Sequence, residues 1–198
     1  MPESSESHST GEAVGAPAAD RYVIDAMISR FTVKAFATGL LSAFGHSPTI
    51  QIRDLKGEIE FHPRALQQSC LRLVVRADSL TVADNINDKD RREIESQMRD
   101  QVLETSKYSE IAYATSSVQK TTDSNDVLLL GRLSLHGVIR PQKIPARLSL
   151  TGDLLRAFGE FSLRQTEYNI RPITAVGGGL KVKDEVKFTF DIAARKQD

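Results

Sequence analysis

The sequence predicts an all-β, mainly antiparallel fold that closes into a barrel and carries one α-helix. Three observations support this prediction. Apolar and polar residues alternate with period two along most of the chain, which is typical of strands that bury one face. A single segment has helical periodicity, and no repeated strand–helix–strand units occur, which excludes a doubly wound sheet. A sandwich remains the alternative, but long strands and a helix able to cover one end favour the barrel.

The period-two alternation is clearest in residues 30–35, 70–77, 129–135, 143–150 and 186–193. In each of these segments every second residue is apolar or small, and most of those between are polar or charged. Such a strand packs one face against a core and exposes the other to water. These segments are therefore predicted to form the barrel wall.

Residues 49–61 also alternate, but the phase changes within the segment. Ile50 and Ile52 occupy even positions, whereas the apolar residues from Leu55 onward occupy odd positions. A β-bulge near residues 53–54 explains this change, because an extra residue in one strand shifts the alternation and bends the strand. Bulges of this kind let long strands curve around a barrel.

The helical exception extends from Asn87 to about Leu103. Ile94, Met98 and Val102 recur every four residues, which places them on one helix face. Asn87 is the predicted N-cap, and acidic residues follow it where the helix dipole favours them. We therefore expect a helix with a narrow apolar stripe that lies across the end of the sheet.

The chain divides into an acidic, Ser/Ala-rich tail over residues 1–20 and a β-barrel domain over residues 21–198. The tail has too few apolar residues to offset the entropy of ordering, so we predict that it is disordered. It lacks the basic start and the apolar stretch of a secretory signal, and no later segment has the length of a membrane span. These features predict a cytoplasmic location.

Charge and motifs exclude several functions. Lys+Arg and Asp+Glu both number 26, so the net charge is zero and nucleic-acid binding is not expected. Cys70 is the one cysteine, which excludes an internal disulfide. His46, His62 and His136 are far apart in the sequence and show no metal-ligand spacing. We therefore expect no cofactor, no metal and no catalytic site.

Six short blocks in a fixed order carry a family resemblance. They are Tyr22–Asp25 (YVID), Gly57–Pro63 (GEIEFHP), Ala77–Leu80 (ADSL), Lys107–Tyr113 (KYSEIAY), His136–Pro141 (HGVIRP) and Val182–Val186 (VKDEV). In this order the blocks resemble the YceI-like family of bacterial lipid-binding proteins. The HGVxRP turn and the order of the blocks are the most specific parts. The resemblance covers about residues 21–194.

The resemblance implies an extended eight-stranded lipocalin-like β-barrel with one α-helix beside or capping it. It also implies that a long amphiphile, typically a polyisoprenoid, occupies the apolar bore for storage or transport. Family members are often periplasmic, and many dimerise, so a homodimer is one expected assembly. Where members commonly carry two histidines, this chain has Ile28 and Ala37, which removes two polar contacts to a ligand head group.

The predicted ligand contacts are the apolar phase of each strand. They are Phe31, Val33, Leu71, Leu73, Val75, Ile111, Tyr113, Leu133, Leu135, Leu148, Phe161, Phe188 and Phe190. Tyr113 and His46 are the candidates for the head-group end, since each has an apolar ring with a polar atom. Two alternatives stay open: a filled barrel that serves as an interaction or structural module, and an enzyme in which a histidine meets a carboxylate inside the barrel.

Overall fold

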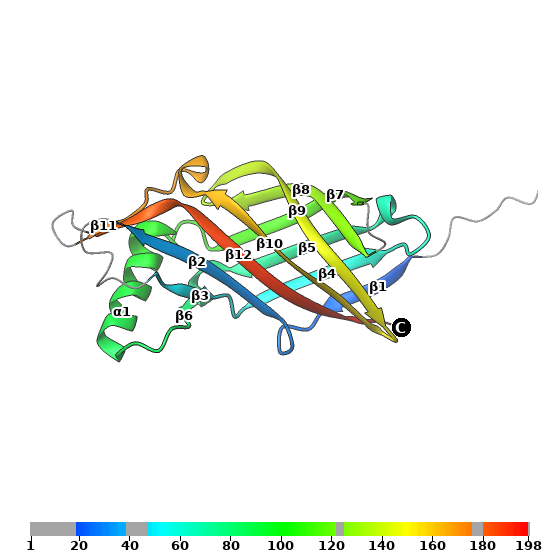
Figure 1. The fold of residues 1–198 in the computed structure, drawn as a ribbon, viewed down its shortest axis with the longest axis horizontal. Helices are drawn as coiled ribbons and strands as arrows, with labels where there is room; N and C mark the ends of the chain where they lie inside the picture. Colours follow the sequence, from blue (N-terminus) through cyan, green and yellow to red (C-terminus); the bar gives the residue numbers. More distant parts are fainter. Residues whose placement is uncertain (1–18, 39–46, 122–124, 176–179, 198) are drawn as a thin grey trace, which may run out of the picture.

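The computed structural model describes residues 19–38, 47–121, 125–175 and 180–197, and Figure 1 shows their arrangement. The strands are β1 (Asp20–Ile24), β2 (Arg30–Thr38), β3 (Thr49–Gln51), β4 (Leu55–Phe61), β5 (Cys70–Arg76), β6 (Thr81–Val82), β7 (Glu110–Lys120), β8 (Asp126–Leu135), β9 (Val138–Thr151), β10 (Leu154–Arg164), β11 (Thr174–Ala175) and β12 (Leu180–Lys196). The helix α1 (Asp88–Gln97) continues into the π-helical turn η3 (Met98–Val102). Short 3₁₀ turns are η1 (Leu66–Gln68), η2 (Ala77–Ser79) and η4 (Gln165–Tyr168).

The strands form one antiparallel sheet that closes on itself. The order β1-β4-β5-β7-β8-β9-β10-β12 returns to β1, because β12 pairs with β1 through Tyr22 and Lys196. Farther along, β12 pairs with β2, then β2 pairs with β3 and β3 with β6. The pairs β1/β2, β3/β4 and β5/β6 are therefore interrupted single strands. Counted in this way, the fold is a closed eight-stranded barrel, and the predicted fold class is confirmed.

The phase change in residues 49–61 has a different cause from the predicted bulge. The strand is interrupted at Ile52–Asp54, between β3 and β4, and the neighbouring strands are interrupted at the same level. Hydrogen bonds connect Asp54, in the break between β3 and β4, to the residues around the break between β5 and β6. Asp54 N donates to Ser79 Oγ (3.1 Å), and Arg76 N donates to Asp54 O (3.0 Å). A break of three residues moves the inward-facing positions from even to odd residue numbers, as a bulge also would. The sequence pattern therefore could not distinguish a break from a bulge.

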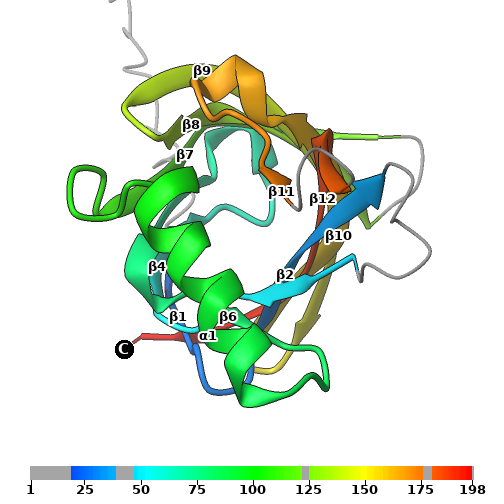
Figure 2. The same cartoon turned by 90° about the vertical axis from the view of Figure 1, so that its left-hand side faces the viewer.

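Helix α1 lies across one end of the barrel, as Figure 2 shows. The predicted N-cap is confirmed, because Asn87 Oδ1 accepts from Asp90 N at 2.9 Å. Glu95 accepts a hydrogen bond from Val82 N at 2.9 Å, and Arg91 donates to Val82 O, so the helix is attached to β6. None of the helices in the described ranges is long and apolar enough to span a membrane.

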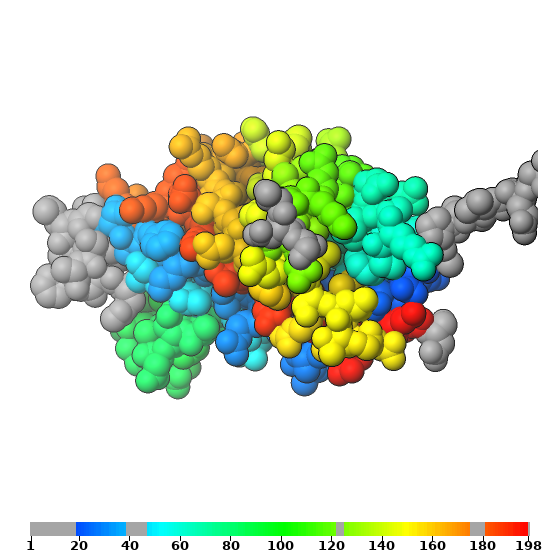
Figure 3. All heavy atoms as spheres, turned by 45° about the vertical axis from the view of Figure 1, so that its right-hand side comes forward, coloured from blue at the N-terminus to red at the C-terminus, as the bar shows by residue number. Residues whose placement is uncertain are grey.

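The opposite end of the barrel is filled with side chains. The rings of Tyr22 and Phe61 meet edge to face with centroids 6.2 Å apart, and Val118, Val127 and Ala146 are buried in the same hydrophobic core. Figure 3 shows β1 (blue) and the C-terminal residues (red) packed together at this end. This end is therefore the closed end.

The sheet begins slightly earlier than the predicted domain boundary. The composition of residues 1–20 places Asp20 in the tail, but Asp20 is the first residue of β1 and pairs with Phe61. Its carboxylate also lies 2.7 Å from Lys196 Nζ. Asp20 therefore belongs to the barrel.

Candidate functional site: an apolar cavity in the barrel

A cavity of about 340 Å³ lies inside the barrel, between α1 and the closed end. Its volume falls within the range typical of small-molecule sites. The inward residues of the strands form most of its wall, and Ile94, Met98 and Val102 of the helical segment complete it. Of the lining side chains in the described parts of the chain, only those of Gln97, Gln165 and Tyr113 contain oxygen or nitrogen, and none is charged. The site is therefore suited to an apolar ligand.

The structure places nearly all the predicted ligand contacts on this wall. They are Phe31, Val33, Leu71, Leu73, Val75, Ile111, Tyr113, Leu133, Leu135, Phe161, Phe188 and Phe190. Leu148 is the one predicted contact that is not on the wall: it packs against the core but does not line the cavity. Leu148 is only partly buried, and it pairs with Ala157 of β10, which does line the cavity, so Leu148 lies next to the wall and not on it. Ligand contact by the twelve residues stays a prediction.

Four phenylalanines form an aromatic part of the wall. Phe161 and Phe188 are stacked with centroids 4.6 Å apart and planes 5° apart, because β10 and β12 place them directly opposite each other. Phe31 meets Phe190 at 6.2 Å in a T-shaped contact. These contacts hold the rings in defined positions, so the wall is preorganised.

Sequence reasoning misses the part of the wall that lies outside the strands. The spacing of Ile94, Met98 and Val102 identifies a buried helix face, but its position above the bore depends on how α1 packs. Ile170 and Ile173 follow η4 in irregular segments that have no periodicity to read. Only the helical stripe carries a signal in the sequence.

Tyr113 occupies the wall in a way that changes its predicted role. Its hydroxyl lies 3.2 Å from Leu129 O and 3.1 Å from Gln142 O, and burial raises its pKa. The one hydroxyl proton is therefore donated to the backbone, not to a ligand head group. His46, the other head-group candidate, lies outside the described residues.

The polar part of the lining lies at the end that carries α1. Gln97 is the last residue of α1, and Gln165 is the first residue of η4. Gln165 Nε2 donates to Lys183 O at 2.9 Å. The next residue is held too: Asp184 accepts from Thr166 N at 2.8 Å and from Thr166 Oγ1 at 2.7 Å. The start of η4 is therefore fixed to β12.

The carboxylate of Asp184 gives this attachment a pH dependence. Hydrogen bonds from Thr166 lower the pKa of Asp184 below its ordinary value of 3.8. Its stabilising contribution is thus complete above that ordinary value and is lost as the pH falls through the lowered one. We expect Asp184→Asn to lower the melting temperature at pH 7, and the difference from wild type to narrow as the pH falls below 3.8, measured by circular dichroism. A deficit that does not change with pH would contradict this.

The two histidines that the structure describes, His62 and His136, both lie away from the cavity wall. Nε2 of His136 lies 2.7 Å from Glu104 Oε2, and its Nδ1 lies 3.2 Å from Tyr168 O. His136 and Gly137 both have positive φ, at 51° and 75°, as in a two-residue type I′ hairpin turn. Neither His136 nor His62 lines the cavity. Within the described ranges, no cluster of three or more metal-ligating side chains occurs.

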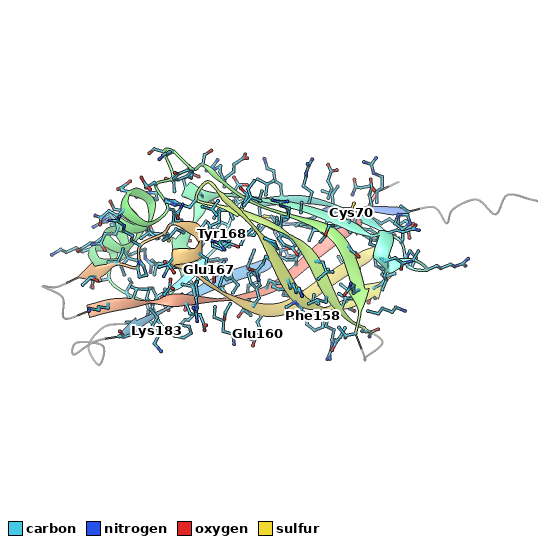
Figure 4. The ribbon with its side chains drawn as sticks, turned by 90° about the horizontal axis from the view of Figure 1, so that it is seen from above. Cys70, Phe158, Glu160, Glu167, Tyr168 and Lys183 are labelled. Carbon is cyan, nitrogen blue, oxygen red and sulfur yellow. The ribbon has the colours of Figure 1, made fainter. Side chains whose placement is uncertain are left out.

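Cys70 is exposed on the outside of the barrel (Figure 4). Its Sγ is 3.7 Å from Glu60 Oε2. Partial burial and the Glu60 charge raise the pKa of the thiol. A raised pKa reduces the thiolate fraction, so this position does not favour a nucleophile.

Comparison with known families gives one match that spans most of the chain. The model of the YceI-like domain matches residues 22–194. No curated protein matches the sequence.

Solved structures share the fold at low sequence identity. Burkholderia cenocepacia BcnA is 12% identical with a TM-score of 0.70, covering 86% of this chain and 98% of BcnA. A polyisoprenoid-binding domain from Saccharophagus degradans is 16% identical with a TM-score of 0.66, covering 89% of this chain and 98% of that domain. The Campylobacter jejuni YCEI protein is 14% identical with a TM-score of 0.59, covering 75% and 85%.

Proposed function

The chain belongs to the YceI-like family, and from this membership and the cavity we propose that it binds one long hydrophobic amphiphile, a polyisoprenoid or another lipid. Binding is non-catalytic and serves storage or transport. The observation that carries the proposal is an apolar cavity of about 340 Å³ without a charged lining residue in the described part of the chain. The polyisoprenoid-binding domain among the structural neighbours supports this class of ligand.

Burial of the ligand's chain supplies the affinity. Each methylene removed from water contributes about 0.8 kcal/mol, so eight buried methylenes contribute about 6 kcal/mol. Association itself costs about 4 kcal/mol or more in lost translation and rotation. A short chain therefore binds weakly, and only a chain long enough to fill the cavity reaches useful affinity. The preorganised rings of Phe31, Phe161, Phe188 and Phe190 reduce the cost of ordering the wall.

The cavity also bears on the two alternatives. A filled-barrel module requires side chains to occupy the bore, as they do at the Tyr22–Phe61 end, yet the space beside α1 is open. An enzyme requires reactive groups at the ligand, and neither His62 nor His136 reaches the cavity wall. Both observations favour non-catalytic binding of a ligand in the cavity.

Mass spectrometry tests the proposal directly. The native mass of the purified protein is compared with the mass of the bare polypeptide, and a denaturing solvent extract is analysed for the released molecule. We expect one hydrophobic molecule per chain. A native mass equal to that of the polypeptide, together with no uptake of added isoprenoids or fatty acids, would overturn the proposal and favour the filled-barrel module.

A further inference from the structure

Two glutamine side chains interrupt the apolar wall, and both lie near its α1 end. Gln97 ends α1, and Gln165 begins η4. Figure 4 places Tyr168 of η4 and Lys183 of β12 in the half of the barrel that carries α1. The far end is closed by apolar side chains, so among the described residues these two amides are the polar groups that the α1 end of the wall offers to the polar end of an amphiphile.

The amide of Gln165 is fixed in one orientation. The residue is only 8% exposed, and Lys183 O is an acceptor, so the NH₂ group must be the part of the amide that faces it. Oε1 therefore points away from that contact, and no donor to it is found among the described residues. The bonds from Thr166 to Asp184 restrain the backbone beside it. Gln165 thus provides a positioned acceptor on the cavity wall.

Gln97 is less constrained. It is half-buried at the cavity, and its amide has no hydrogen-bond partner in the described part of the chain. It offers both an NH₂ donor and a carbonyl acceptor. A hydroxyl head group that donates its proton to Gln165 Oε1 can still accept a hydrogen bond. The NH₂ group of Gln97 can donate that second hydrogen bond.

We propose that the ligand carries an uncharged head group that donates a hydrogen bond, an alcohol or a phenol, bound by Gln165 Oε1 and by Gln97. This inference rests on the proposed function. A phosphate or carboxylate head is disfavoured for two reasons: a buried anion needs a cationic or multiple-donor partner, and Oε1 would repel it. An ether or ester head is uncharged, but it has no proton to donate to Oε1.

Three probes with the same isoprenoid chain separate these classes. Delipidated protein is titrated with geranylgeraniol, with its methyl ether and with geranylgeranyl phosphate, and dissociation constants are measured by competition with a fluorescent fatty probe. One uncharged hydrogen bond corresponds to about a five- to tenfold change in affinity. We expect the alcohol to bind about five- to tenfold tighter than the ether, and the phosphate to bind more weakly than both.

Substitutions then test which side chain is responsible. Gln165→Leu is expected to bring the alcohol-to-ether ratio close to one while leaving ether affinity nearly unchanged. Gln97→Leu, which leaves the Lys183 contact intact, is expected to reduce the ratio as well. Gln119→Leu on the exposed face of β7 is the matched control and should keep the wild-type ratio. Because the ratio is measured within each protein, a change in stability does not imitate the effect.

The outcomes distinguish this inference from the proposed function. Equal binding of all three probes, or tightest binding of the phosphate, would overturn the head-group assignment and leave lipid binding intact. A wild-type ratio in both Gln165→Leu and Gln97→Leu would also overturn it. Binding of none of the probes, at any concentration below their aggregation, would count against the proposed function itself.

Discussion

Replacing Ala157 with Phe will remove the ligand without unfolding the protein. Ala157 lines the cavity on β10, opposite Ile192 of β12, so a larger side chain there enters open space. Excluding only two methylenes of the ligand costs about 1.6 kcal/mol, which is more than tenfold in affinity. We expect at least a tenfold loss of co-purified lipid by mass spectrometry, with a melting temperature equal to or above that of delipidated wild type.

Two matched substitutions define what this result means. Ala146 is buried at the closed end and does not line the cavity, so Ala146→Phe overpacks a filled region and costs about 1–3 kcal/mol. Ala114→Phe on the exposed outer face should change neither lipid content nor stability. If Ala157→Phe destabilises as much as Ala146→Phe, the space beside Ala157 is not available to a ligand.

Replacing Gly131 with Ala will destabilise the barrel strongly, although it adds a single methyl group. The ring of Tyr113 crosses directly over Gly131, and a Cβ there would lie 2.6 Å from Tyr113 Cζ and 2.7 Å from its hydroxyl. The same Cβ would also clash with Ala114 O on the paired strand. Neither the backbone nor the buried ring moves freely, so we expect a loss of about 2–3 kcal/mol. For a chain of this size that is roughly 4–12 °C in melting temperature.

Gly152 provides the control for this prediction. It lies in the turn between β9 and β10 with φ of 56°, and nothing lies within 4 Å of an added Cβ. Gly152→Ala therefore incurs only the cost of a positive φ, about 1 kcal/mol. Equal losses for the two variants in thermal denaturation would show that the Tyr113 contact is not the cause at Gly131.

Periodicity predicted which side chains point inward, because a strand must place alternate residues on opposite faces. It did not predict which inward positions border the cavity. Leu148 has the inward phase of β9 but does not line the cavity, although its partner Ala157 on β10 does, and Leu150 on the same phase is 49% exposed. Which inward side chains border open space depends on the register with β8 and β10 and on how the closed sheet packs around them.

Long-range contacts were also beyond the sequence. His136 meets Glu104 and Tyr168, each 32 residues away, whereas the HGVIRP block by itself indicates only a turn. Gln165 carries no signal at all, since a lone glutamine after a strand resembles any surface residue. Its proposed role depends on Lys183 of another strand, whose backbone oxygen accepts a hydrogen bond from the Gln165 amide.

The sequence by itself determined the all-β class, the helix and its cap, the inward phase of the strands and the family, because these follow from local periodicity and from short blocks of residues. The tertiary structure alone decided that the bore is open beside α1 and filled at the Tyr22–Phe61 end. The physical reason is that a cavity is a difference between the space enclosed by the closed sheet and the volume of its inward side chains. That difference depends on how eight strands and one helix are placed together, and no single segment contains it.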